Sequence, residues 1–230
     1  MKQIYALALS LVSVVTFADV TNSGQHLFIL SGQSNMARLE PSKVFIPTLI
    51  KEFGESNIII VKEASGGLSI QHWKKNWPPQ NQNIYLRLIT LINQAIKNKS
   101  IQTVTFVWMQ GERDAKEGYG SMYSDNLKEL LKQLQIDLGH KNINFVLGRL
   151  SDFGLNNPNF PHWNLIRSSQ TEIAENSPYG AWVNTDDLND GFNLEGVSIK
   201  NDLHYSVEGY NTFGKRLAEK SIELISRQTQ

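Results

Sequence analysis

The chain has 230 residues with equal numbers of basic and acidic side chains, so its formal net charge at pH 7 is zero. This length fits one domain with a substantial core, and the charge balance, with no basic stripe of interleaved aromatics, argues against nucleic acid as a partner. The absence of cysteine excludes disulfides, thiolate metal sites and a cysteine nucleophile.

The first 18 residues have the pattern of a cleaved secretory signal. Lys2 supplies a positive charge, Ile4 to Val15 is almost wholly apolar, and Thr16-Phe17-Ala18 ends on the small residue that signal peptidase needs. The alternative is a membrane anchor, but the apolar stretch is shorter than the roughly 20 residues that span a bilayer. We therefore expect an exported protein, periplasmic or secreted, whose mature domain covers residues 19–230 and contains no membrane segment.

After the signal, strand and helix patterns alternate along the chain. Strands are expected over five apolar runs with little alternation, which is typical of strands covered on both faces: His26 to Leu30, Asn57 to Val61, Thr103 to Met109, Phe145 to Leu150 and Ala181 to Asn184. Apolar residues at helical spacing predict helices over Ile84 to Asn98, Ser124 to Leu138, Trp163 to Asn176 and Ser206 to Ser226. This order predicts an α/β protein, a three-layer α/β/α sandwich around a parallel sheet of about five strands.

Polar clusters follow the first three strands, and a fourth precedes the last helix. They are Ser31-Gly32-Gln33-Ser34-Asn35-Met36, Ser65-Gly66-Gly67, Gln110-Gly111-Glu112 and Asn201-Asp202-Leu203-His204. Each cluster alone also fits an ordinary turn. In a parallel sheet, however, the carboxyl ends of all strands share one edge, so these clusters are expected to converge.

Together, the clusters contain the groups that acyl transfer requires. Ser34 is the candidate nucleophile, and His204 is the candidate base, because it is the histidine that lies in a polar, acidic loop directly before a helix. The candidate donors to an oxyanion are the backbone N–H of Ser34, a backbone N–H at Gly66 or Gly67, and the side-chain amide of Gln110.

These four clusters, with Trp73 shortly after the second, resemble in order the sequence blocks of SGNH hydrolases. Within that superfamily they are similar to the sialate O-acetylesterase and acetylxylan esterase branch, carbohydrate esterase family six, in which a glutamine such as Gln110 replaces the block-three asparagine. The resemblance implies a flavodoxin-like fold and a metal-free enzyme, without a cofactor, that removes acetyl groups from sugar hydroxyls. It also implies Ser34 as nucleophile, His204 as base, and Ser34, Gly67 and Gln110 as oxyanion donors.

One position departs from that branch. The residue three before the histidine is usually an aspartate, but here it is Asn201, and Asp202 comes one residue later. Either Asp202 reaches the imidazole or another acid orients it. We favour Glu112 slightly over Asp202, because block three belongs to the same site.

Two further segments contain candidate functional residues. The loop from Ile70 to Asn83 is rich in aromatic residues, of which Trp73 and Trp77 are candidate substrate contacts that would stack on a sugar ring. The acidic run from Asp186 to Asp190 lacks the spacing of a calcium-binding EF-hand, and we interpret it as a solvated loop.

The sequence therefore predicts an exported serine esterase that deacetylates a carbohydrate, such as sialic acid or xylan, through an acyl-serine intermediate. Two alternatives remain open. One is a non-catalytic carbohydrate-binding protein of the same fold, and the other is an SGNH thioesterase or lipase, which would need an apolar groove for an acyl chain.

Overall fold

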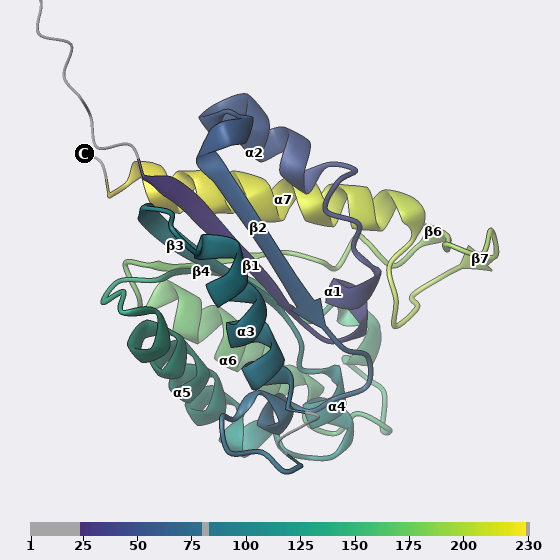
Figure 1. Ribbon diagram of the computed structural model, residues 1–230. Helices are drawn as coiled ribbons and strands as arrows, with labels where there is room; N and C mark the ends of the chain where they lie inside the picture. The colour runs from purple at the N-terminus through teal and green to yellow at the C-terminus, as the bar shows by residue number, and fades with distance from the viewer. Residues whose placement is uncertain (1–23, 80–82, 229–230) are drawn as a thin grey trace, which may run out of the picture.

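A computed structural model describes residues 24–79 and 83–228, so the predicted secretory signal lies outside the described residues. At its centre is a parallel five-stranded sheet in the order β2-β1-β3-β4-β5, beside a separate antiparallel pair, β6-β7 (Figure 1). The predicted α/β fold class is thereby confirmed. The strands are β1 (Gln25–Gly32), β2 (Ile58–Ala64), β3 (Ile101–Met109), β4 (Asn144–Gly148), β5 (Gly180–Val183), β6 (Gly191–Phe192) and β7 (Ser198–Ile199).

Helices cover both faces of the sheet. They are α1 (Ser34–Arg38), α2 (Phe45–Phe53), α3 (Ile84–Ile96), α4 (Glu112–Lys116), α5 (Gly120–Leu138), α6 (Trp163–Glu175) and α7 (Val207–Ser226). The pair α2 and α7 packs on one face, while α3, α5 and α6 lie on the other (Figure 1). The four predicted helices are present, whereas α1, α2 and α4 were not predicted, because such short segments show too little helical periodicity.

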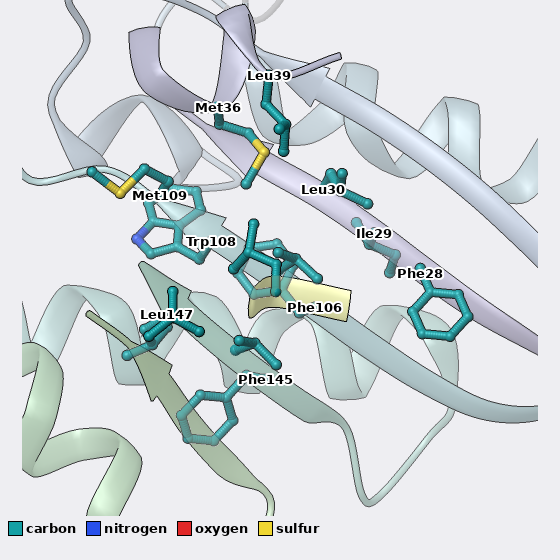
Figure 2. Packing of buried hydrophobic residues seen from close by; sticks show 14 of the residues in the cluster. Phe28, Ile29, Leu30, Met36, Leu39, Phe106, Trp108, Met109, Phe145 and Leu147 are labelled. Atoms are coloured by element: carbon teal, nitrogen blue, oxygen red, sulfur yellow. The ribbon is translucent and has the colours of Figure 1, made fainter. Parts of the chain in front are cut away.

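The core is built on the central strands. Phe28, Ile29 and Leu30 of β1 are fully buried, as are Phe106 and Trp108 of β3 (Figure 2). Since successive side chains of a strand point to opposite faces, continuous burial requires cover on both sides. The unalternating apolar runs therefore match the two helical layers.

The carboxyl end of β1 lies unusually close to β3. Gly32 has φ +141°, and a Cβ atom at this position would lie 2.0 Å from the carbonyl oxygen of Met109. This close approach, which only glycine permits, lets the next N–H, of Gln33, donate to that carbonyl at 2.8 Å. The chain then turns directly into α1, whose first residue is Ser34.

None of the helices among the described residues is both long and apolar enough to span a bilayer.

We predict that Gly32→Ala lowers the free energy of unfolding more than Gly196→Ala does. Both glycines have positive φ, but a Cβ at Gly196 meets nothing within 4 Å, so only the Gly32 variant adds a steric clash to the backbone strain. The expected difference is about 1–3 kcal/mol, as for other overpacking substitutions. Urea unfolding of both variants measures it, and equal destabilisation would contradict the close-approach argument.

Candidate active site

A cleft of about 510 Å³ lies at the carboxyl edge of the sheet. All four polar clusters contribute to its lining, which consists of Gln33, Ser34, Gly66, Gly67, Glu112, Leu203 and His204 together with Ala37, Arg38, Arg113, Lys116 and Phe160. Segments far apart in the sequence are thus brought together here, as the parallel topology requires.

Ser34 and His204 face each other in this cleft. The Ser34 Oγ and His204 Nε2 atoms are 3.1 Å apart, which is hydrogen-bond distance for a nucleophile and its base. Burial and the nearby Arg38 guanidinium lower the pKa of His204, against the opposing effect of Asp202 and Glu195. The imidazole is therefore neutral at neutral pH, the state in which Nε2 accepts the serine proton.

The double glycine lies next to the serine. A Cβ at Gly66 would be 3.7 Å from the Cβ of Ser34, and a Cβ at Gly67, which has φ +72°, would meet nothing within 4 Å. Neither glycine therefore places a side chain in the cleft that they line. The backbone N–H of Ser34, in the first turn of α1, has no acceptor within its own helix.

The side chain of Gln110 does not face the cleft, as its predicted role of oxyanion donor would require. It is fully buried and is not among the residues lining the cleft. Its side-chain Nε2 donates to the Leu68 carbonyl at 3.1 Å, to Gln33 Oε1 at 3.3 Å, and to Asp114 Oδ2. The amide that was predicted to face an oxyanion thus donates to buried protein acceptors instead.

Glu112 contacts the histidine loop through an intermediary. Its Oε1 accepts from Asn35 Nδ2 at 3.0 Å, and the same amide nitrogen donates to the Leu203 carbonyl at 3.1 Å. Burial raises the pKa of Glu112 to about 7. Within the described residues, no hydrogen bond or ion pair joins Glu112 to the His204 ring.

Asp202 is the carboxylate that approaches the imidazole. Its Oδ1 accepts from the backbone N–H of His204 at 2.8 Å and lies 3.9 Å from His204 Nδ1. Asn201, at the position where the resembling branch has aspartate, instead accepts from Asn189 Nδ2 through its side-chain oxygen at 3.2 Å. The geometry therefore favours Asp202 over Glu112, the reverse of the order expected from the sequence.

The structure contradicts the predicted substrate contact of Trp73. This side chain is fully buried, packs edge-on against Trp108 and donates from its indole N–H to Ser31 Oγ at 2.8 Å. Trp77 is partly buried against the His72 ring and is not among the described residues that line the cleft. Phe160 is the aromatic residue that lines the cleft. It lies in the loop after β4, whose Asn and Pro residues mark it as a loop at the carboxyl edge, but the sequence analysis did not consider it.

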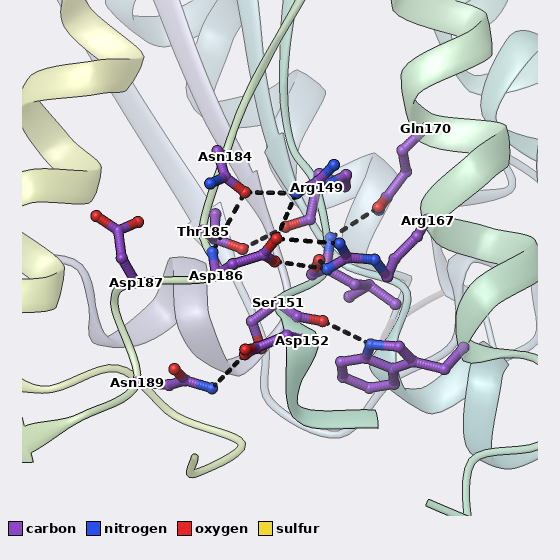
Figure 3. A network of polar contacts seen from close by, with 12 residues as sticks. Arg149, Ser151, Asp152, Arg167, Gln170, Asn184, Thr185, Asp186, Asp187 and Asn189 are labelled. Atoms are coloured by element: carbon purple, nitrogen blue, oxygen red, sulfur yellow. Dashed lines mark hydrogen bonds and ion pairs between the residues drawn. The ribbon is translucent and has the colours of Figure 1, made fainter. Parts of the chain in front are cut away.

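The acidic run after β5 is also not the solvated loop that was predicted. Asp186 forms ion pairs with Arg149 and Arg167, each at 2.7 Å, and Asp187 pairs with Arg216 at 2.6 Å. Figure 3 shows the arginine side chains converging on Asp186. Within the described ranges, no group of three or more His, Asp and Glu side chains is placed to hold a metal ion.

Three cations line the cleft. Arg38 lies 3.5 Å from Glu195, in the turn between β6 and β7, and Arg113 lies 3.0 Å from Glu117. Lys116 is exposed, and no acidic partner is recorded for it among the described residues. The rim therefore carries positive charge that an anionic ligand can meet.

The sequence matches the family model described as "Carbohydrate esterase, sialic acid-specific acetylesterase" over residues 37–223. No curated protein matched the chain.

Several solved structures share the fold. A protein from Arabidopsis thaliana superposes with a TM-score of 0.68 at 18% identity, covering 87% of this chain and 98% of its own. NanS gives 0.64 at 12% identity, with 90% and 98% covered. A carbohydrate acetylesterase from Xanthomonas citri gives 0.59 at 16% identity, with 85% of this chain but only 55% of that chain covered. At these identities the structural likeness supports the fold.

We predict that Arg38→Gln raises the pKa of His204. The guanidinium disfavours the imidazolium, so its removal stabilises the protonated ring and the titration moves to higher pH. Glu195→Gln should move the pKa the opposite way, because Glu195 favours the protonated form. NMR titration of the His204 ring measures both, and shifts in one common direction would contradict the assignment of these charges.

Proposed function

We propose that this chain, which belongs to the sialic acid-specific acetylesterase family of carbohydrate esterases, removes O-acetyl groups from a carbohydrate through an acyl-serine intermediate. The observation that carries the proposal is the 3.1 Å contact between Ser34 Oγ and His204 Nε2 at the open cleft. This contact supplies the nucleophile and base that ester hydrolysis requires.

In the proposed reaction, Ser34 Oγ attacks the acetyl carbonyl while His204 Nε2 takes the hydroxyl proton. The imidazolium then gives this proton to the departing sugar oxygen, which leaves an acetyl ester on Ser34. In the second half, His204 takes a proton from water as the water oxygen attacks, and acetate leaves with Ser34 Oγ regaining the proton. General acid–base catalysis of this kind contributes about 10²–10⁴-fold to rate.

Asp202 is the proposed partner of the imidazolium. Its Oδ1 lies 3.9 Å from His204 Nδ1, so a small rotation of the imidazole would bring the two into hydrogen-bond contact when the ring becomes charged. Glu112 has a different proposed role. Through Asn35 it holds the Leu203 carbonyl, and so fixes the backbone of the loop that carries His204.

The proposed substrate is an acetylated acidic sugar. A sialic acid carries a carboxylate, which the exposed Lys116 would attract from a cleft that Arg38 and Arg113 also line, whereas the xylose backbone of xylan is neutral. Phe160 offers an apolar face to a sugar ring. The cationic lining is less suited to an acyl chain, which disfavours the thioesterase or lipase alternative.

Export also remains a proposal. If the signal predicted from residues 1–18 is cleaved after Ala18, the protein recovered from outside the cytoplasm begins at Asp19. Intact mass of the exported protein tests this.

We predict that the wild-type protein releases acetate from O-acetylated sialic acid faster than from acetylated xylan. Ser34→Ala should lower this release by at least about a thousandfold, because the nucleophile is lost. Acetate assays on both substrates, with covalent labelling of Ser34 by a fluorophosphonate, make the measurement. No release and no labelling of the wild type would favour the non-catalytic binding protein.

The charge argument predicts an effect of Lys116 on substrate binding. Lys116→Met should raise KM for the acidic sugar about fivefold, as expected for roughly 1 kcal/mol from an exposed ion pair, and leave kcat nearly unchanged. Lys99→Met, an exposed lysine just before β3 at the opposite edge of the sheet, is the matched control. Equal KM values for both variants would argue for a neutral sugar.

We predict that Asp202→Asn lowers kcat by at least about tenfold, because it removes the charge that stabilises the imidazolium. Glu112→Gln should change kcat less than about threefold, since a glutamine oxygen can still accept from Asn35. Steady-state kinetics on 4-nitrophenyl acetate compares the two, with the exposed Asp125→Asn as control. A larger loss of kcat in Glu112→Gln than in Asp202→Asn would instead favour Glu112 as the acid that orients His204, as expected from the sequence.

A further inference from the structure

A second cavity, which we call the side cavity, adjoins the cleft at Arg38. Its volume is about 240 Å³, and Arg38 lines both the side cavity and the cleft. Ser34 and Arg38 are four residues apart in α1, so they lie on one face of this helix with about 6 Å of rise between them. A ligand held at Ser34 that extends along α1 past Arg38 therefore reaches the side cavity.

Apolar side chains from three parts of the chain line the side cavity. Two of them, Leu194 and Val207, are 46% and 39% exposed. Exposed apolar side chains that gather around one cavity, rather than being scattered, are typical of a ligand site. The full apolar set is Leu39 and Val44 at the ends of the loop between α1 and α2, Leu194 in the turn between β6 and β7, and Val207 and Tyr210 in α7.

The polar groups around the side cavity are already partnered. The Tyr210 hydroxyl donates to Asn35 Oδ1 at 2.9 Å, so this residue offers its ring rather than its hydroxyl. The two charged residues Glu40 and Lys43 lie 3.7 Å from each other. The side cavity is therefore suited to an apolar ligand more than to a polar one.

The turn between β6 and β7 holds Leu194 at the side cavity. Asn193 Oδ1 closes this turn, because it accepts from the backbone N–H of Glu195 at 3.1 Å and from that of Val197 at 2.8 Å. The hairpin projects from the rest of the fold at the N-terminal end of α7 (Figure 1). Its turn thus presents an apolar side chain, Leu194, to the side cavity and a carboxylate, Glu195, to Arg38.

The ion pair between Arg38 and Glu195 lies where the cleft meets the side cavity. The two side chains are 3.5 Å apart and are 36% and 59% exposed, so the pair contributes little to stability. A guanidinium is planar, and aromatic rings stack on its faces. An aromatic group can therefore lie along Arg38 while the guanidinium keeps Glu195 as its partner.

We propose that the side cavity binds an apolar aglycone, the group to which the acetylated sugar is attached, while the sugar itself occupies the cleft. The inference rests on the proposed function and extends its substrate from a sugar to a glycoside. The side cavity is smaller than the roughly 300–1,000 Å³ of pockets that enclose a whole drug-sized ligand, so it fits one ring or a short alkyl chain. Its aliphatic side chains favour such a group over a second sugar, because hydroxyls buried against them without hydrogen bonds cost free energy.

The test compares the 4-methylumbelliferyl and methyl glycosides of one O-acetylated sialic acid. Calorimetry with Ser34→Ala measures the dissociation constants without consuming the ligands, and we expect the aryl glycoside to bind about tenfold more tightly. Leu194→Ser, added to that variant, should lower this preference about fivefold, because it removes an apolar wall of the side cavity. Ile136→Ser, which changes an exposed aliphatic residue on α5, is the matched control and should preserve the preference.

A second variant and a second measurement separate binding from misfolding. Val207→Thr keeps the shape of the side chain but adds a hydroxyl to the wall, and it should lower the preference about threefold. NMR of the Ser34→Ala protein gives a direct readout. The aryl glycoside should shift the methyl signals of Leu194 and Val207, whereas the methyl glycoside should leave them in place.

Equal dissociation constants for the two glycosides would overturn the inference, as would a preference that both folded wall variants retain. In either case, acetate release from the glycosides by the wild type would leave the proposed function intact. A wild type that binds the glycosides but releases no acetate would overturn the proposed esterase, while the ratio of affinities would still decide the inference. Binding of neither glycoside, with no acetate release, would overturn both.

Discussion

The site depends on how the carboxyl end of β1 is held between its two neighbours. Toward β3, Gln33 N–H donates to the Met109 carbonyl at 2.8 Å, and toward β2 the Gly32 carbonyl accepts from Ser65 N–H at 3.0 Å. These backbone bonds set the start of α1, the double-glycine turn and the Gln110 loop at one level. His204 comes from near the C-terminal end of the chain, and these strand contacts do not hold its loop. The loop is held instead by the hydrogen bond from Asn35 Nδ2 to the Leu203 carbonyl.

The charges around the cleft are arranged in layers. In the buried part of the site, burial raises the pKa of Glu112 to about 7 and also raises the pKa of Asp114, so these carboxyls carry less negative charge than exposed ones at the same pH. At the rim, Arg38 disfavours protonation of His204, and Lys116 is exposed. A neutral base and a rim that attracts anions are therefore compatible, because burial and the rim cation Arg38 both disfavour the imidazolium.

The sequence predicted the scaffold better than the details of the site. Continuous apolar runs are a strong signal of buried strands. Because the carboxyl ends of parallel strands share one edge of the sheet, Ser34, Gly67 and His204 could be expected to lie together without knowledge of any side-chain contact. Side-chain direction has no such signal. Nothing in the sequence distinguishes a tryptophan that lines a cleft from Trp73, which bonds to the strand beneath it, or shows that Gln110 turns inward.

Asn201 stands where the resembling branch has an aspartate, and its geometry gives it a different, structural role. Its φ of +45° is a conformation that asparagine tolerates better than most residues, and its backbone N–H donates to Asp190 Oδ1 at 2.6 Å. With its side-chain oxygen bonded to Asn189, the residue closes the loop between β7 and α7. This turn directs the following residues toward the cleft, so that Asn201 shapes the loop while Asp202 is the residue whose carboxylate lies 3.9 Å from the imidazole.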